Sequence, residues 1–240
     1  MRPAGSTVSI IVPTFNEREH IADLITDLYA KIEAPLEVIV VDDASPDGTA
    51  DVVAGLQHPN LRLIRRKARG LAAAFHRGIL EAHGDIIGWM DADATMPPEV
   101  MNQLISQLDE YDIAIGSRYV EDGSDNRHPV RVWASYAVNW LARLVLGGGI
   151  KDYDSGFIAI RRGVFDHVTL MPFGHGEYFI EFIYDVYRAG LKIKEVGYAF
   201  RDRTVGISKS APSLIVFLFT GLQYVLRIFS LRFRFLTRKS

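Results

Sequence analysis

Short apolar runs alternate with stretches of helical period along the first 90 residues of the chain. After the first run, apolar side chains recur three or four positions apart between Ile21 and Leu28, which is the period of an α-helix that buries one face. Strands that alternate with helices of about ten to fifteen residues are typical of a parallel sheet covered on both faces. The runs that we expect to form strands are residues 8–12, 36–41, 61–64 and 86–90.

The second half of the chain continues this alternation with one interruption. The segment from Glu121 to Pro129 is polar and has no hydrophobic period, so we predict a loop there. No internal repeat or low-complexity linker occurs before Ser208, so we predict one α/β domain over residues 1–210, with a doubly wound and mostly parallel sheet. The remaining expected elements are strands at residues 113–116, 157–160 and 192–200 and helices at residues 130–146 and 178–189.

The last part of the chain has a different character. The 14 residues from Ser213 to Leu226 carry no charge, whereas a membrane-spanning helix needs about 20 apolar residues. Arginines from Arg227 onward interrupt any extension, so we predict that residues 211–240 form a basic amphipathic helical tail in the plane of a membrane surface. The alternative is a C-terminal helix that packs on the domain or on a partner subunit.

Charge is unevenly distributed along a chain whose composition is that of an ordinary globular protein, with 48% hydrophobic and 23% charged residues. From Thr204 to Ser240 there is no Asp or Glu, and the Lys and Arg side chains give this segment a charge of +6. Since the whole chain carries −2, the first 203 residues carry −8. An acidic body with a basic, apolar tail indicates that the two parts meet different surroundings. We expect a membrane surface and no nucleic acid as partner.

The chain contains no cysteine, which excludes disulfides and thiolate chemistry and permits a reducing compartment. Residues Met1 to Thr7 are polar, lead straight into the first expected strand and lack the hydrophobic region of a signal peptide. We therefore expect the catalytic part at the cytoplasmic face of a membrane, with peripheral association.

Acidic and polar residues follow three of the expected strands, where ligands bind in open α/β sheets. They are Thr14 to Glu17 after the first strand, Asp42 and Asp43 after the second, and the Asp91-Ala92-Asp93 triplet after the fourth. Like charges gathered beside an apolar strand are costly unless a cation or hydrogen-bond donors neutralise them. Hard oxygen ligands without nearby His or Cys point to Mg²⁺ or Mn²⁺, which one or two carboxylates and substrate phosphates commonly hold.

The alternative function of these acids is to cap helices, because Asp is a preferred N-cap residue. That interpretation suits Asp47, and for Asp42 and Asp43 it stays open. It suits the triplet poorly, since one cap does not need two carboxylates two positions apart. The chain has neither a G-x-G-x-x-G after a strand nor a G-x-x-x-x-G-K-[ST], so the usual dinucleotide and P-loop sites lose support.

Several motifs occur in one order along residues 8–210. The first three are Val-Pro-Thr-Phe-Asn-Glu at 12–17, Val-Asp-Asp-Ala-Ser-Pro-Asp-Gly-Thr at 41–49 and Met-Asp-Ala-Asp at 90–93. This succession resembles the inverting family-2 glycosyltransferases of GT-A fold, and within them the polyprenol-phosphate (dolichol-phosphate) mannosyltransferases. The same order continues with Arg69-Gly70-Leu71, Pro97-Pro98-Glu99, Gly116 to Tyr119, Asp152, Ser155 to Phe157, Arg203, Gly206, Ser208 and Lys209.

The resemblance implies a GT-A, Rossmann-like fold and a role for each matching residue. The nucleotide-sugar donor would be bound by Pro13, Glu17, Asp42, Asp43, Gly70, Asp91, Ala92 and Asp93. Asp91 and Asp93 would also hold the Mg²⁺ or Mn²⁺ that bridges the donor diphosphate. The acceptor phosphate and the leaving diphosphate would be surrounded by Arg118, Arg131, Arg203 and Lys209, which with Asp93 form the expected catalytic set. Ser135 and Asn139 match the helix after the acceptor loop.

The chain also departs from the family pattern. Ala94, Thr95 and Met96 stand after the triplet where the family often has Leu-Gln-His or Leu-Ser-His, so the Thr95 hydroxyl or a water would have to replace a third metal contact. Asp154 stands where the family usually has Thr or Met, and Gly197 stands where it usually has Pro.

The conspicuous cations favour a phosphate acceptor. A sugar hydroxyl must lose a proton as it attacks and so needs a general base. A phosphate monoester has a second pKa of about 6 and is mostly a dianion at pH 7, so it needs orientation by cations more than a base. If the acceptor is a hydroxyl instead, Asp93 and Asp152 are the candidate bases. Glu181, on an expected helix, is predicted to be a buried partner for a cation or a backbone donor.

The leading hypothesis is transfer of mannose from GDP-mannose to a polyprenyl phosphate, with a separate membrane subunit as a further partner to consider. The alternatives are a UDP-glucose or other nucleotide-sugar transferase to the same lipid, and a glycan-elongating family-2 enzyme with a hydroxyl acceptor. A sugar-phosphate nucleotidyltransferase would need a glycine-rich loop with Arg and Lys after the first strand, and residues 14–17 are not such a loop. A binding scaffold without activity would have a broken triplet or lost arginines.

Overall fold

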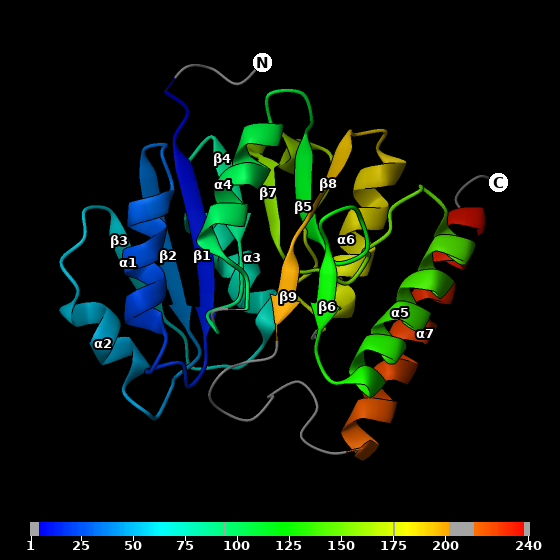
Figure 1. The fold of residues 1–240 in the computed structure, drawn as a ribbon, viewed down its shortest axis with the longest axis horizontal. Coiled ribbons are helices and arrows are strands. Elements are labelled where there is room, and N and C mark those ends of the chain that lie inside the picture. Colours follow the sequence, from blue (N-terminus) through cyan, green and yellow to red (C-terminus); the bar gives the residue numbers. More distant parts are fainter. Residues whose placement is uncertain (1–4, 94, 175, 202–213, 238–240) are drawn as a thin grey trace.

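A seven-stranded sheet forms the centre of the molecule in a computed structural model that describes residues 5–93, 95–174, 176–201 and 214–237. The strand order is β3-β2-β1-β4-β7-β5-β8 (Figure 1). All neighbouring strands are parallel except those that pair with β7, which is antiparallel to β4 and β5. The mostly parallel sheet is confirmed. The strands are β1 (Val8–Thr14), β2 (Leu36–Asp42), β3 (Leu61–Arg65), β4 (Ile86–Trp89), β5 (Ile113–Ser117), β7 (Ile158–Arg161) and β8 (Ile193–Gly197).

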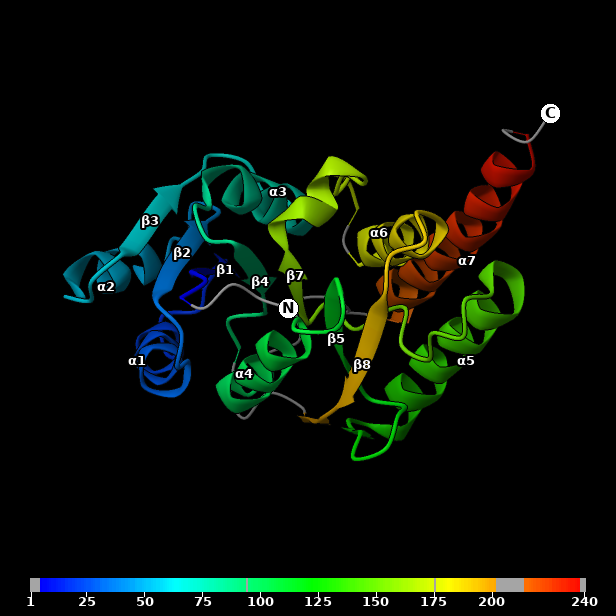
Figure 2. The ribbon, with the colours of Figure 1, turned by 90° about the horizontal axis from the view of Figure 1, so that it is seen from above.

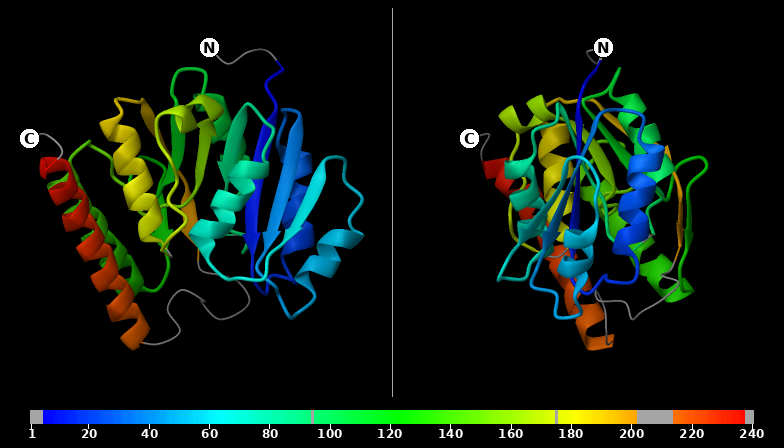
Figure 3. Two further views of the ribbon diagram at one scale, coloured as in Figure 1. Left: turned by 180° about the vertical axis from the view of Figure 1, so that it is seen from behind. Right: turned by 90° about the vertical axis from the view of Figure 1, so that its left-hand side faces the viewer.

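Helices cover both faces of this sheet, as the apolar runs predicted (Figures 2 and 3). On one face lie α1 (Ile21–Lys31) and α4 (Pro98–Gln107), with α2 (Thr49–Gly55) beside α1. On the other lie α3 (Leu71–Glu81) and α6 (Glu177–Arg188). Because β1, β2, β4 and β5 are buried on both sides, their side chains are apolar without alternation.

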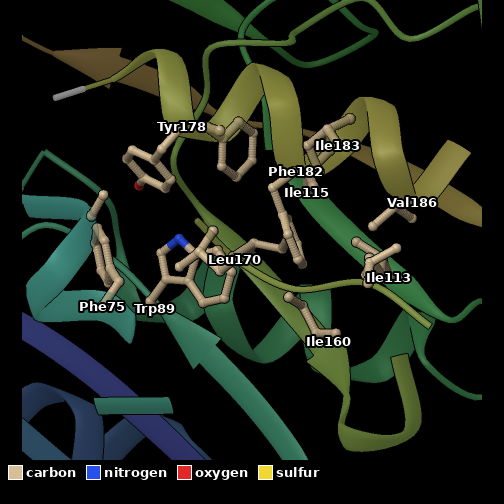
Figure 4. Close-up of a cluster of buried hydrophobic side chains, with 14 of the residues drawn as sticks. Phe75, Trp89, Ile113, Ile115, Ile160, Leu170, Tyr178, Phe182, Ile183 and Val186 are labelled. Carbon is tan, nitrogen blue, oxygen red and sulfur yellow. The ribbon is translucent and has the colours of Figure 1, made fainter. Parts of the chain in front are cut away.

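Aromatic packing under α6 fixes the end of β4. Trp89 is the last residue of β4, and its ring centroid lies 5.5 Å from that of Phe75 in α3 and 5.7 Å from that of Phe182 in α6 (Figure 4). Aromatic pairs at such distances add to the stabilisation from buried area. The strand end that leads into the Asp91-Ala92-Asp93 triplet is therefore held from both flanking helices.

The predicted loop at 121–129 is wrong in one detail, because it contains the short strand β6 (Ser124–Asn126). β6 pairs in parallel with β9 (Ala199–Arg201), and the strand expected at 192–200 is split into β8 and β9. The split lies at Tyr198, and at Gly197, the last residue of β8, a Cβ would approach the carbonyl oxygen of Glu121 to 2.0 Å. Close approach of the backbone at residues 121–123 thus gives a physical reason for glycine at position 197.

The C-terminal helix α7 (Leu214–Thr237) packs beside α5 (Pro129–Leu146) and against α6 (Figures 1 and 2). Ile228 and Leu231 of α7 are fully buried and belong to the same apolar cluster as the sheet. The described part of the tail is therefore packed on the domain along one face, which is the alternative raised for it from the sequence.

Charge pairs between α6 and α7 reinforce this packing. Arg227 lies 3.0 Å and Arg234 2.6 Å from the carboxylate of Glu181, and Arg234 also lies 2.9 Å from Asp185. The prediction that Glu181 is a buried partner for a cation is confirmed. Within the described ranges, no helix has the length and apolarity required to cross a bilayer.

Two adjacent residues of α7 test this packing. Ile228→Ala removes a buried side chain and should lower the free energy of unfolding by about 2–5 kcal/mol. The matched control Phe229→Ala alters a side chain that is 52% exposed, and it should change stability by no more than about 0.5 kcal/mol. Chemical denaturation measures both, and equal losses in the two variants would contradict the described orientation of α7.

Candidate active site

The carboxyl ends of β1, β2 and β4 lie at one edge of the sheet because the three strands are parallel (Figure 1). β1 and β2 end in register, whereas Trp89 at the end of β4 is aligned with Ile11 of β1. Thr14 is aligned with Asp42, and its hydroxyl donates to the Asp42 carboxylate at 2.9 Å. The backbone N–H of Ser45 donates to the same carboxylate at 3.0 Å. Pro13 and Glu17 are buried beside this edge. The expected nucleotide-binding residues of the first two strands are thus brought together.

Asp43 joins the second strand to the start of α3. Its Oδ2 accepts the N–H of Gly70 at 2.8 Å, and the Arg66 guanidinium lies 2.9 Å from its Oδ1. Burial raises the pKa of the Asp43 carboxyl in spite of these contacts, which lower it. Next to this pair the Arg69 guanidinium lies over the Phe15 ring, 3.7 Å from its centroid, a favourable cation–π geometry.

The helix-capping alternative is displaced by one residue for Asp47: the N-cap residue of α2 is Gly48, and Asp47 bonds the first turn of the helix from the position before it. Its Oδ1 accepts the N–H of Thr49, the first residue of α2, at 2.9 Å. Asp42 instead binds Thr14 and Ser45 within the turn after β2.

The triplet after β4 places two carboxylates at the same edge. Asp93 and Ala92 are buried, and Asp91 is half-buried. The Thr95 hydroxyl donates to Asp93 Oδ1 at 2.6 Å, and the Thr95 N–H donates to it at 3.2 Å. Thr95, which was considered as a third metal contact, therefore orients the Asp93 carboxylate. Ala94 lies outside the described residues.

These oxygens fit a hard divalent cation. In the described part of the chain, no group of three or more His, Cys, Asp or Glu side chains is arranged to hold a metal ion. Two carboxylates are sufficient for Mg²⁺ or Mn²⁺ when substrate phosphates supply further ligands. The residues present thus suit an ion that is bound together with a diphosphate.

Arg118, expected to face the acceptor phosphate, is instead buried in an ion-pair network at the end of β5. Its side chain is bonded in bidentate fashion to Asp152, with Nε 2.8 Å from Oδ2 and Nη2 2.6 Å from Oδ1. Asp125 and Asp154 lie 3.9 and 3.7 Å from the guanidinium. Arg118 is 5% exposed, so three carboxylates satisfy it from within the protein.

The same network corrects the expectation for Asp152. Its exposure is 0%, and both carboxylate oxygens accept hydrogen bonds from Arg118. A carboxylate held in this way is not placed to take a proton from a sugar hydroxyl. The pair is a structural element of the site, and the alternative in which Asp152 acts as a base loses support.

Helix α5 and the residues before it support the network. Arg127 bonds Asp125 through Nε at 2.8 Å and donates to the Ser135 hydroxyl at 2.8 Å. The Asn139 side chain accepts the N–H of Tyr153 at 2.6 Å, so α5 holds the turn before β7. Ser135 and Asn139, which matched the family pattern, therefore both form hydrogen bonds that support the network.

Of the other three cations expected at the acceptor phosphate, only Arg131 lies in the described part of the chain. Arg131 is half-buried in the first turn of α5, and none of the carboxylates in the described ranges forms an ion pair with it. Arg203 and Lys209 lie outside the described residues.

Several residues of the site were not predicted from the sequence. Arg127 and Asp125 stand in a stretch that shows no period, and Tyr224 of α7 lies far along the chain from the turn that it contacts. Asp154 was noticed only as a departure. No local pattern indicates these contacts, since they form between segments that the fold brings together.

Removal of one partner tests the buried pair. Asp152→Asn keeps the shape of the side chain but leaves the Arg118 guanidinium without its bidentate carboxylate, so stability should fall by about 3–5 kcal/mol. Asp27→Asn, at an exposed position on α1, is the control and should be close to neutral. Urea unfolding measures both, and wild-type stability in Asp152→Asn would contradict the network.

Comparisons with known proteins agree with this geometry. The sequence profile of glycosyl transferase family 2 matches residues 9–169. A dolichol-phosphate mannosyltransferase of Pyrococcus furiosus is 37% identical over 92% of this chain and 63% of its own length. A polyprenol monophosphomannose synthase of Mycolicibacterium smegmatis is 33% identical over 90% of this chain and 84% of its own length. The chain thus spans less than two thirds of the Pyrococcus protein.

A third relative and a solved structure extend the comparison. An undecaprenyl-phosphate mannosyltransferase of Micrococcus luteus is 31% identical over 87% of this chain and 89% of its own length. Glucosyl-3-phosphoglycerate synthase from Mycobacterium tuberculosis, crystallised with Mn²⁺, UDP and glucosyl-3-phosphoglycerate, superposes with a TM-score of 0.73 at 22% identity, over 95% of this chain and 80% of that one. This likeness shows the GT-A-like fold. The chain is therefore a glycosyltransferase that belongs to glycosyl transferase family 2.

Proposed function

We propose that the protein transfers mannose from GDP-mannose, with inversion, to a polyprenyl monophosphate. The observation that carries this proposal is the pair of carboxylates Asp91 and Asp93 at the end of β4, in a chain whose relatives are named as mannosyltransferases of dolichol, polyprenol and undecaprenyl phosphate. The carboxylates account for the diphosphate donor. The relatives suggest the sugar and the lipid.

The donor would lie along the edge formed by β1, β2 and β4. Asp42 and Asp43, which are fixed by Thr14 and Gly70, would accept hydrogen bonds from the base or ribose beside Pro13 and Glu17. Asp91 and Asp93 would hold Mg²⁺ or Mn²⁺, which when bound neutralises charge on the departing diphosphate. Thr95 supports this role because its hydroxyl keeps the Asp93 carboxylate in one orientation.

The acceptor side would need cations rather than a base, because a phosphate monoester is already mostly a dianion at pH 7. Arg131 is the candidate among the described residues, and Arg203 and Lys209 complete the proposed set. Arg118 is placed to orient other residues of the site, because it bonds the carboxylate of Asp152 and the carbonyl oxygen of Asp154 in the turn before β7. We therefore assign Arg118 a positioning role.

An exposed aromatic face on α5 and α7 supports a membrane-surface location for the acceptor. Both helices carry rows of exposed apolar side chains at helical spacing, and Trp133 is 74% exposed. Trp and Tyr are enriched at membrane interfaces, and apolar rows of this kind insert into the headgroup region. We place this face on the cytoplasmic side of the membrane; a separate membrane subunit is the alternative occupant. The face consists of Val130, Trp133, Tyr136, Trp140 and Leu144 of α5 and Leu222, Leu226, Phe229 and Phe233 of α7.

Transfer to lipid tests the proposal directly. Purified protein with Mn²⁺ and a short polyprenyl phosphate should form polyprenyl-phosphate mannose from labelled GDP-mannose, and chelation should stop the reaction. UDP-glucose and other nucleotide sugars belong in the same panel. Transfer from another donor would correct the sugar, and no transfer to lipid from any donor would contradict the proposed reaction.

Two single substitutions test the triplet. Asp91→Asn and Asp93→Asn each remove a charge from the proposed metal site while keeping the shape of the side chain. Turnover should fall by about 10²–10³-fold or more, because stabilisation of the leaving diphosphate is lost. The melting temperature should stay within about 3 °C of wild type. Near-normal turnover in both variants would show that the triplet does not hold the ion.

Liposome binding tests the exposed aromatic face. The double variant Trp133→Ser and Trp140→Ser removes two large interfacial side chains without affecting the packed face of α7, so it should lose most binding to vesicles. Leu80→Ser, which changes a 70% exposed residue of α3, is the matched control and should bind as wild type does. Equal binding by all three proteins in a flotation assay would remove this face from the proposal.

A further inference from the structure

Among the described side chains of the C-terminal helix, that of Tyr224 reaches the candidate active site. Its ring packs against the buried cluster that includes Tyr178 and Phe179 of α6. Its hydroxyl hydrogen-bonds the carboxylate of Asp154, in the turn before β7. Burial, with the charge of Asp154 second, raises the pKa of Tyr224 well above its ordinary value. The hydroxyl therefore stays protonated, and it donates to Asp154.

Gly176, the residue before α6, leaves the space that this hydroxyl fills. A Cβ at Gly176 would lie 1.6 Å from the Tyr224 hydroxyl oxygen and 3.7 Å from Asp154 Oδ1. The φ angle of Gly176 is −131°, which any residue adopts, so the glycine is required for space and not for backbone conformation. Tyr224, Asp154 and the start of α6 thus fit together at one point.

Asp154 links the Tyr224 hydroxyl to the Arg118–Asp152 pair, and its charge also acts on Tyr178, as that of Asp91 does. Its carbonyl oxygen accepts from Arg118 at 3.1 Å, and its N–H donates to Asp152 at 3.3 Å. On the other side, Tyr178 is influenced by the charges of both Asp91 and Asp154, which after burial are the main causes of its raised pKa. Asp154 therefore contacts the Arg118–Asp152 pair directly, and the buried Tyr178 ring lies within electrostatic range of both Asp154 and Asp91.

The rest of α7 sets the position of Tyr224. Ile228 and Leu231 follow it by one and two helical turns on the buried face. Arg227 and Arg234 pair with Glu181 of α6 on the same side. These contacts fix the rotation of α7 about its axis, so Tyr224 points toward Asp154 while the exposed aromatic face points outward.

We propose that Tyr224 is a positioning residue for sugar transfer, which holds the turn at 152–156 in the orientation that the acceptor side of the site needs. Burial and the Asp152 charge raise the pKa of Asp154 to about 6, so its ionised form is costly and depends on donors. Without the Tyr224 hydroxyl, the Asp154 carboxylate loses a hydrogen-bond donor while it still lies near the carboxylates of Asp125 and Asp152 around Arg118. We expect the turn at 152–156 to shift as a result. The catalytic part of this inference rests on the proposed transfer to lipid.

Two substitutions remove the contact from opposite sides. Tyr224→Phe deletes the hydroxyl and keeps the ring, whereas Gly176→Ala puts a methyl group where the hydroxyl lies. Each should lower kcat/KM for the polyprenyl phosphate by about tenfold, since small misplacements at a reacting centre are costly. Binding of GDP with Mn²⁺ should be unchanged, because the nucleotide edge is not touched. In the double variant the two effects should not add, since they remove one shared contact.

Hydrogen exchange supplies a readout that does not need the reaction. Tyr224→Phe should speed amide exchange at residues 152–157 and 176–179 and leave residues 8–42 as in wild type. Leu28→Ala is the control: it removes a buried side chain of α1 on the other face of the sheet from α7, so it should lower the melting temperature without the tenfold loss in kcat/KM.

The outcomes separate the two proposals. Selective exchange at 152–157 together with a non-additive loss of kcat/KM supports the positioning role. Unchanged exchange in Tyr224→Phe, wild-type kinetics in that variant, or an equal kinetic loss in Leu28→Ala would overturn it. If the wild-type protein transfers no sugar to lipid, the proposed function fails, and the exchange experiment still decides whether Tyr224 holds the turn.

Discussion

The alignment of β1, β2 and β4 brings four aspartates to one edge of the sheet, and the rest of the site depends on how their charges are accommodated. Like charges beside apolar strands are unfavourable without compensation. The protein compensates part of this charge with fixed hydrogen-bond donors and one cation. They are Thr14 and Ser45 for Asp42, Gly70 and Arg66 for Asp43, and Thr95 for Asp93. Rigid carboxylates that retain negative charge are suited to a divalent cation and the diphosphate that it carries.

The other half of the site follows the opposite design, with one buried cation surrounded by carboxylates. Arg118 pairs with Asp152 and Asp154 of the turn before β7 and with Asp125 of β6, two segments that meet at the end of β5. Because a buried guanidinium with these partners is already satisfied, it serves as a fixed point for the turn before β7. Asn139 of α5 and Tyr224 of α7 both bond to that turn, and Gly176 before α6 leaves the space for the Tyr224 hydroxyl. The surface proposed to meet lipid is thereby tied to the acceptor side of the site.

Local periodicity was sufficient to predict most of the sheet and both helical layers, because strands buried on two faces have apolar runs that a sequence shows directly. It also located the triplet after β4, since a motif at a strand end needs no tertiary information. It could not predict that β7 is antiparallel or that residues 124–126 form β6, because pairing is decided by segments distant in sequence. The expectation that Arg118 faces the acceptor phosphate came from the family resemblance, and a motif match does not reveal the three carboxylates that surround its guanidinium. Glu181 was predicted correctly, since a carboxylate on an apolar helix must have a partner.

The central claim is that Asp91 and Asp93 form, with a bound diphosphate, a site for a divalent cation. Calorimetric titration of GDP into the protein with Mn²⁺ or with a chelator tests this claim without any assumption about the acceptor. The account predicts that chelation, or Asp93→Asn in the presence of Mn²⁺, weakens GDP binding by more than about tenfold, or 1.4 kcal/mol. Equal affinity for GDP with and without the ion, and in the variant, would contradict it.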